Sequence, residues 1–104
     1  KVYKALLTQA GTNPPVVTVL VNTLGAVPVS SYDFAGAFRL TSAGLFPDDK
    51  THVVINGFND ASDGNRIGAF RVNSNYVLIT TADNTLTGAN DVLTSTSITI
   101  EVFP

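Results

Sequence analysis

Few side chains in this sequence are chemically reactive. The chain of 104 residues contains one histidine, His52, and no cysteine, methionine or tryptophan, and only 13% of its residues are charged. Enzymes most often use histidine for proton transfer, and they activate a Ser, Cys, Thr or Lys nucleophile with a neighbouring base. His52 stands in the sequence Thr-His-Val-Val, with no recognisable Ser, Cys or Asp motif around it. We therefore interpret His52 as an ordinary surface or strand-end histidine, and we expect a protein that is not an enzyme.

Carboxylates are the second group of side chains that could do chemistry. A glycosidase needs two carboxyl groups that converge across a cleft. The candidate carboxylates are spread along the chain as Asp33, Asp60, Asp63, Asp83, Asp91 and Glu101. Only Asp33 and Glu101 fall within predicted strands, and the alternation of residues places both on polar faces. A hydrolase is therefore the weakest of three functional alternatives, and it requires two of these acids to meet in space.

The polar segment 59–65 is the best candidate for a ligand or partner loop. It reads Asn-Asp-Ala-Ser-Asp-Gly-Asn, so it supplies side-chain oxygens and a glycine, as a calcium-binding loop does. It lacks the alternating carboxylates and the terminal glutamate of an EF-hand, and aspartates are also natural turn residues. We therefore expect no metal and no cofactor. The residues that we retain as a candidate ligand or partner loop are Asn59, Asp60, Asp63 and Asn65.

Charge and hydropathy exclude two further classes of partner. The net charge is −2 and the six basic residues are scattered, whereas a nucleic-acid-binding protein needs clustered Lys and Arg. The segment 64–68 lacks the spacing, and the following helix, of a phosphate-binding glycine motif. No segment approaches the roughly 20 apolar residues of a membrane helix. We therefore expect neither nucleic acid binding nor a membrane span.

Alternation of apolar and polar residues with a period of two predicts β-strands along the whole chain. Turn residues such as Gly, Pro, Asn and Asp separate them. In the predicted strand 32–40, Phe34, Gly36, Phe38 and Leu40 are expected to share one face. The polar segment 42–50 is predicted to be a surface connection whose Leu45 and Phe46 close one end of the core. The predicted strands cover residues 2–9, 16–23, 27–31, 32–40, 51–58, 66–72, 76–81 and 94–103.

Short strands at intervals of about ten residues are typical of a sandwich or a small barrel. We predict a single all-β domain over residues 1–104: an antiparallel β-sandwich, jelly-roll or immunoglobulin-like, of about seven or eight strands. The clearest hairpin is formed by residues 66–72 and 76–81, which flank Asn-Ser-Asn. Pairing of sheet edges between subunits could add a strand to such a sheet.

Three stretches of the sequence resemble a small domain of bacteriophage proteins. They read VYKALLTQAGTNPPVVTVLVNTLG, AGAFRLTSAGLFPDDKTHVVI and LTSTSITIEVFP. The resemblance is to a small β-rich domain that recurs in structural proteins of tailed bacteriophages and prophages, especially of Bacteroidota. Its shared features are the ALLTQ…PVV entry, the NTLG turn and the ending of Ile-Glu, two hydrophobic residues and Pro. These are strand and turn positions, so the resemblance implies fold and context but no catalytic residue.

The resemblance implies a structural component of the virion, such as a capsid decoration, head-fibre, neck or tail-associated domain. Such a protein would work by symmetric self-assembly with other virion proteins, and our first expectation is a homotrimer. The alternative is a carbohydrate-binding or receptor-binding module, for example one that contacts a glycan on the host surface. In that case Tyr3, Tyr32 and Tyr76 could provide an aromatic platform beside the Asn-rich and Asp-rich loops, although tyrosine is equally common as a packed strand residue.

Overall fold

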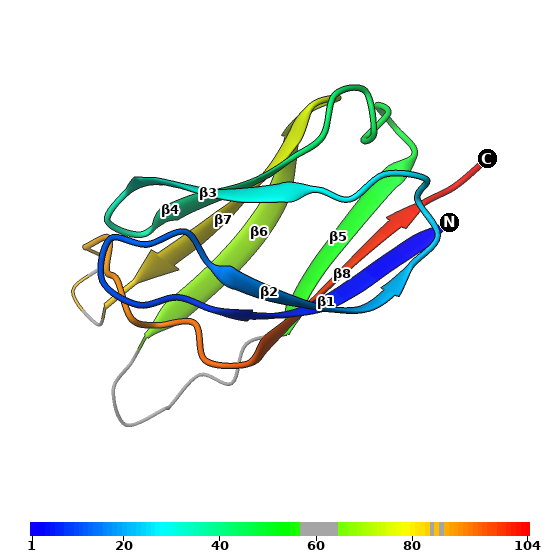
Figure 1. The fold of residues 1–104 in the computed structure, drawn as a ribbon. Helices are drawn as coiled ribbons and strands as arrows, with labels where there is room; N and C mark the ends of the chain where they lie inside the picture. Colours follow the sequence, from blue (N-terminus) through cyan, green and yellow to red (C-terminus); the bar gives the residue numbers. More distant parts are fainter. Residues whose placement is uncertain (57–64, 84, 86) are drawn as a thin grey trace.

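The computed structural model describes residues 1–56, 65–83, 85 and 87–104. These residues form strands and no helix, and the two four-stranded sheets have the orders β2-β1-β8-β5 and β3-β4-β7-β6 (Figure 1). Every neighbouring pair is antiparallel, so the predicted all-β antiparallel sandwich is confirmed. The strands are β1 (Val2–Thr8), β2 (Val16–Asn22), β3 (Val29–Phe34), β4 (Ala37–Thr41), β5 (Thr51–Asn56), β6 (Arg66–Asn73), β7 (Tyr76–Ala82) and β8 (Thr96–Val102).

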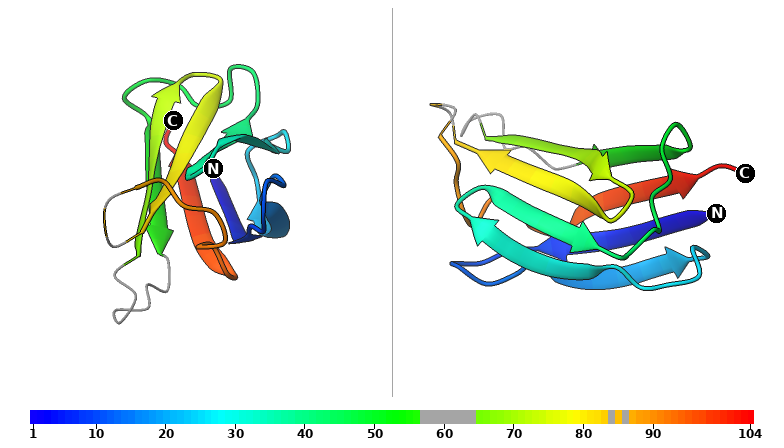
Figure 2. Two further views of the ribbon diagram at one scale, coloured as in Figure 1. Left: turned by 90° about the vertical axis from the view of Figure 1, so that its left-hand side faces the viewer. Right: turned by 90° about the horizontal axis from the view of Figure 1, so that it is seen from above.

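The first and last strands of the chain pair with each other in the middle of one sheet. The two ends of the chain consequently lie at the same end of the sandwich (Figure 2), where the Val102 N–H donates a hydrogen bond to the Lys1 carbonyl. Each sheet has two edge strands, which are β2 and β5 in one sheet and β3 and β6 in the other. Within the sandwich class, this order differs from the A-B-E-D and C-F-G order of a constant-type immunoglobulin domain.

The core consists of the inward-facing residues of both sheets. Alternation along β1 buries Tyr3, Ala5 and Leu7 completely, and alternation along β8 buries Ile98 and Ile100. These are the faces that the period of two predicts for the two strands. The buried cluster comprises Tyr3, Ala5, Leu7, Leu24, Phe38, Leu40, Phe46, Val77, Ile79, Leu93, Ile98 and Ile100.

The prediction of a continuous strand over residues 32–40 is wrong. The chain turns at Ala35 and Gly36, and the segment forms the β3–β4 hairpin. Gly36 has a φ of +81°, in the region that favours glycine. Phe34 and Phe38 therefore belong to different strands: Phe38 is buried, whereas Phe34 is 67% exposed.

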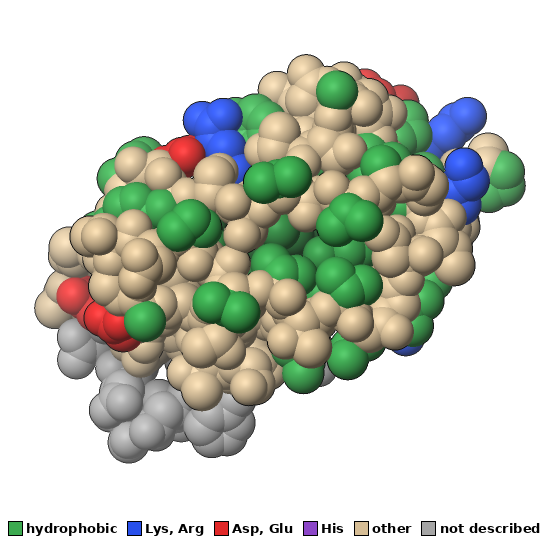
Figure 3. Space-filling view, viewed as in Figure 1, with side chains coloured by type: hydrophobic (Ala, Val, Ile, Leu, Met, Phe, Trp, Pro, Cys, Tyr) green, Lys and Arg blue, Asp and Glu red, His purple; other side chains and the backbone are tan. Residues whose placement is uncertain are grey.

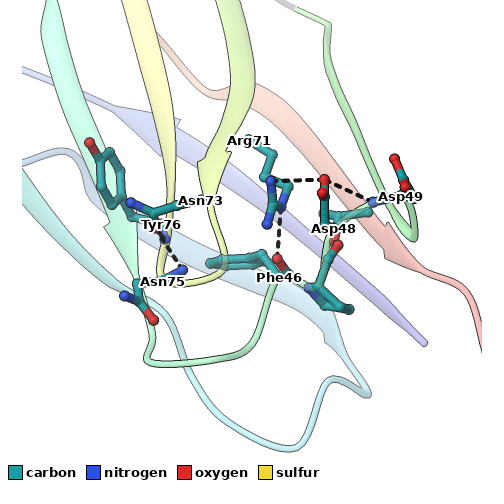
Figure 4. Close-up of polar contacts among 9 residues, drawn as sticks. Phe46, Asp48, Asp49, Arg71, Asn73, Asn75 and Tyr76 are labelled. Carbon is teal, nitrogen blue, oxygen red and sulfur yellow. Dashed lines mark hydrogen bonds and ion pairs between the residues drawn. The ribbon is translucent and has the colours of Figure 1, made fainter.

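Residues 42–50 form a surface connection, as predicted, and hydrogen bonds join it to the β6–β7 hairpin (Figure 4). Arg71 donates from Nε to the Phe46 carbonyl at 2.8 Å, and its Nη1 lies 3.3 Å from Asp48 Oδ1. The Phe46 N–H in turn donates to the Ser74 carbonyl. These bonds hold the buried Phe46 ring over one end of the core, which is the position that the sequence indicates.

Tyr3 places a hydroxyl group in the core. Its side chain is 0% exposed, and among the described residues its hydroxyl has no hydrogen-bond partner. Burial raises the pKa of Tyr3 above its ordinary value of 10.0, because the phenolate would lose its hydration. The hydroxyl therefore destabilises the folded state relative to a phenyl ring of the same shape.

Replacing Tyr3 by phenylalanine is expected to raise the free energy of unfolding by about 1 kcal/mol, since an unsatisfied buried polar group costs about 1–3 kcal/mol. Because the folded-state pKa is raised, the unfolded chain releases the Tyr3 proton first, and wild-type stability falls as the pH rises above the ordinary value of 10.0. The Tyr3→Phe variant has no hydroxyl to titrate at this position, so its free energy of unfolding should fall less than that of the wild type as the pH rises. Urea unfolding at about pH 8 and about pH 11 measures both effects, and a less stable variant at the lower pH would contradict the prediction.

Candidate interaction surface

His52 lies on the outer face of β5, exposed to solvent and directly opposite Glu101 of β8. In the part of the chain that the structure describes, no three His, Cys, Asp or Glu side chains come close enough to hold a metal ion. His52 and Glu101 thus form a cross-strand pair on the outer face of this sheet.

The candidate carboxylates Asp33, Asp83 and Asp91, which the structure describes, each have a partner. Asp33 forms an ion pair with Arg39, with 2.6 Å between Oδ2 and Nε. Asp91 Oδ1 accepts a hydrogen bond from the Gly11 N–H at 2.8 Å. Hydrogen bonds from the side chain and backbone of Thr85, and from the backbone of Thr87, lower the pKa of Asp83 below its ordinary value of 3.8. These contacts stabilise turns and strand ends, as expected for aspartates near chain reversals.

Most of the segment 59–65, the candidate ligand or partner loop, lies outside the described residues. Asn59, Asp60 and Asp63 fall in the segment 57–64, which is outside the described residues. Asn65 immediately precedes β6 and is partly buried.

The three tyrosines occupy separate environments. Tyr3 is buried in the core. Tyr32 packs against the core with its ring centroid 5.8 Å from that of Phe38, and its hydroxyl accepts a hydrogen bond from Asn90. Tyr76 is covered by the Arg39 guanidinium, which lies 4.2 Å from the ring centroid. The tyrosines therefore do not form a common aromatic platform.

The most unusual surface of the protein is an apolar strip along β2, β3 and their connection. Figure 3 shows hydrophobic side chains gathered across the face on which these strands lie. Of the eleven large hydrophobic residues that are exposed in the described chain, seven come from residues 16–34. We call these seven the apolar edge: Val16, Val19, Leu20, Val21, Val27, Val29 and Phe34.

The sandwich is less closely packed at this side than at the opposite one. β5 and β6 run beside each other, whereas β2 and β3 stand farther apart (Figure 1) and are joined by a hydrogen bond from Ser30 Oγ to the Pro15 carbonyl. Val19 pairs with Ala5, which faces the core and is completely buried, yet Val19 is 42% exposed. An inward-facing residue is thus exposed because no neighbouring strand covers it.

β2 is also the edge strand with the least protection against pairing with another chain. Edge strands expose unpaired N–H and C=O groups, and natural proteins commonly protect them with charged residues, prolines or bulges. β3 contains Asp33, β5 contains His52, and β6 contains Arg66 and Arg71. β2 has a bulge-like register shift opposite β1, but it has no ionisable side chain and no proline. Its sequence, VVTVLVN, is apolar on both faces.

Sequence reasoning did not identify this surface, although a signal for it is present. No Lys, Arg, Asp or Glu stands between Lys4 and Asp33, and this uncharged stretch contains the whole of β2. A strand apolar on both faces is usually read as the centre of a sheet, because central strands are covered on both sides. Only the strand order shows that β2 lies at an edge.

No family model, no curated protein and no solved structure matches the chain. The class of the protein is therefore described by its own fold and surface: it is an antiparallel β-sandwich with an uncharged apolar edge. The described residues include no helix of the length and hydropathy needed to cross a membrane.

Proposed function

We propose that this chain is a non-enzymatic structural module that assembles with copies of itself through the apolar edge. The observation that carries the proposal is the exposure of seven large hydrophobic side chains on one side of the sandwich. Each of the seven is between 41% and 67% exposed, so together they present apolar surface to water on this side of the molecule. Covering this surface would remove it from water, and each buried Å² contributes about 25 cal/mol.

The proposed setting is the virion of a tailed bacteriophage, where the protein would be a capsid decoration, head-fibre, neck or tail-associated domain. The support for this setting is the sequence resemblance, and self-association would suit a particle built from repeated subunits. Contacts with other virion proteins belong to the same proposal.

Self-assembly is tested by multi-angle light scattering of the purified chain at micromolar concentration. We expect a mass that is a multiple of the 10.9 kDa chain. Val29→Lys places a charge on the apolar edge at a position that is 67% exposed, so it should lower the mass without unfolding the protein. Val72→Lys, on the outer side of the opposite edge strand β6, is the control and should keep the wild-type mass. A wild-type chain that remains monomeric at these concentrations would contradict the proposal.

The second candidate function is carbohydrate or receptor binding, and one observation favours it. The outer face of the β3-β4-β7-β6 sheet has Ser31, Arg39, Leu78 and Phe70 in one cross-strand row, and Phe70 is 49% exposed. An exposed aromatic ring beside polar groups suits a sugar, which has both apolar faces and hydroxyls. A glycan array distinguishes the candidates, since a purely structural module gives no specific signal.

A further inference from the structure

We infer that β2 pairs with β2 of a second copy, antiparallel and about a two-fold axis. This pairing would join the two β2-β1-β8-β5 sheets into one continuous sheet. The inference rests on the proposed self-assembly, and it names the partner and the contacting strand.

The backbone of β2 provides the first argument. β2 lies at the outer rim of the sandwich (Figure 2), and its seven residues pair with β1 on one side only. In an antiparallel ladder, about half of the N–H and C=O groups of a strand point to each side. The groups of β2 that point away from β1 form a template for a further strand.

The side chains explain why β2 is preferred over the other edges. Charged side chains on an edge strand disfavour pairing with another chain. β3 contains Asp33, and β6 contains Arg66 and Arg71. β5 contains the polar His52. β2 has no ionisable residue, so none of these side chains hinders its pairing with a second copy.

Pairing about a two-fold axis sets the number of copies. A stable interface buries about 800 Å² on each partner. The exposed Val16, Val19, Leu20 and Val21 side chains and the backbone of β2 would contribute to this area. In an isologous contact both copies use the same patch, so no copy can add once two have paired. We therefore expect a dimer, whereas the sequence resemblance led us to expect a trimer.

Val19 is the residue at which the two copies should meet. It is the middle residue of β2 (Val16–Asn22), so full overlap of two antiparallel copies places Val19 opposite Val19. Directly opposite residues have Cβ atoms about 5 Å apart. A lysine at this position would therefore face the lysine of the second copy.

The experiment uses Val19→Lys and Val19→Glu in the full chain, with Val54→Lys as the matched control. Val54 is 45% exposed and Val19 is 42% exposed, and both lie on edge strands of the same sheet. By light scattering we expect wild type and Val54→Lys at twice the 10.9 kDa chain mass. Val19→Lys and Val19→Glu should each be monomeric, with a dimer dissociation constant raised at least about 100-fold by the facing like charges. An equimolar mixture of the two should return to the mass of two chains, because opposite charges then face each other.

Circular dichroism and thermal unfolding check that each variant is folded. If either Val19 variant does not fold, Leu20→Lys together with Leu20→Glu replaces the pair, since Leu20 is more exposed at 57%. A wild type that assembles while the Val19 variants keep its mass would overturn β2 pairing but leave the proposed self-assembly intact. A wild-type mass of three chains, or mixtures that stay monomeric, would overturn the two-fold pairing. A monomeric wild type would overturn both proposals.

Discussion

Replacing Gly36 by alanine is expected to destabilise the fold by about 3–5 kcal/mol, the range of the most severe single substitutions. Gly36 forms the β3–β4 turn with a φ of +81°, which an L-residue with a side chain rarely adopts. A Cβ atom at this position would overlap the Thr81 carbonyl oxygen and lie 2.7 Å from the Gly88 Cα. The obstructing atoms belong to the backbone, and they cannot move aside easily because the Thr81 N–H donates a 2.9 Å hydrogen bond to the Gly36 carbonyl.

Gly44→Ala separates the steric effect from the backbone conformation. Gly44 has a φ of +69°, but a Cβ atom there meets nothing within 4 Å. We expect a loss of about 1 kcal/mol for this variant, from the left-handed conformation alone. Urea unfolding of both variants at one protein concentration measures the difference. Equal losses would show that the contact with Thr81 and Gly88 does not restrict residue 36.

Replacing Phe38 by alanine is expected to cost about 3–5 kcal/mol, the usual range for removing a buried phenylalanine. Phe38 is 0% exposed and lies on the inner face of β4, between Tyr32 and Ile79 on the adjacent strands. Deleting its ring leaves a cavity that these neighbours cannot fill without changing their own packing. Since a domain of this size is stable by about 5–15 kcal/mol, the variant should unfold at a much lower denaturant concentration.

Phe34→Ala is the matched control, because it removes the same side chain from the same hairpin. Phe34 is 67% exposed, so its loss should change the free energy of unfolding by less than about 0.5 kcal/mol. Both variants are compared at the same protein concentration, since self-association would make stability concentration-dependent. If the two substitutions destabilised the protein equally, the assignment of Phe38 to the core and of Phe34 to the apolar edge would be wrong.

Local patterns were sufficient to predict the class of fold. The period of two along β1 and β8 follows from the pleat of a strand, which directs alternate side chains to opposite faces. The inward positions of Tyr3 and Ile98 could therefore be assigned without knowledge of the neighbouring strands. The turn at Gly36 was missed because Phe34, Gly36, Phe38 and Leu40 keep the same alternation on both sides of it. A short hairpin can preserve a period of two while reversing the chain, so alternation alone does not locate the turn.

The candidate site required more than the sequence pattern. Among the described candidates, Asp33 pairs with Arg39, Asp91 accepts a hydrogen bond from Gly11, and His52 lies opposite Glu101 on an outer sheet face. The tyrosine platform was an open alternative that the structure does not assemble, because Tyr3, Tyr32 and Tyr76 point into different environments. Which side chains share a surface depends on contacts between strands far apart in the sequence.

The sequence by itself determined that the chain forms alternating strands, which of their faces are apolar, and that it has few reactive groups. Only the tertiary structure decided that β2 is an edge strand and that its apolar residues face solvent. The physical reason is that a strand's pattern depends on its own residues, whereas its position in a sheet depends on which other strands bond to it. The apolar sequence of β2 would equally suit a covered strand, and the order β2-β1-β8-β5 makes it an exposed surface.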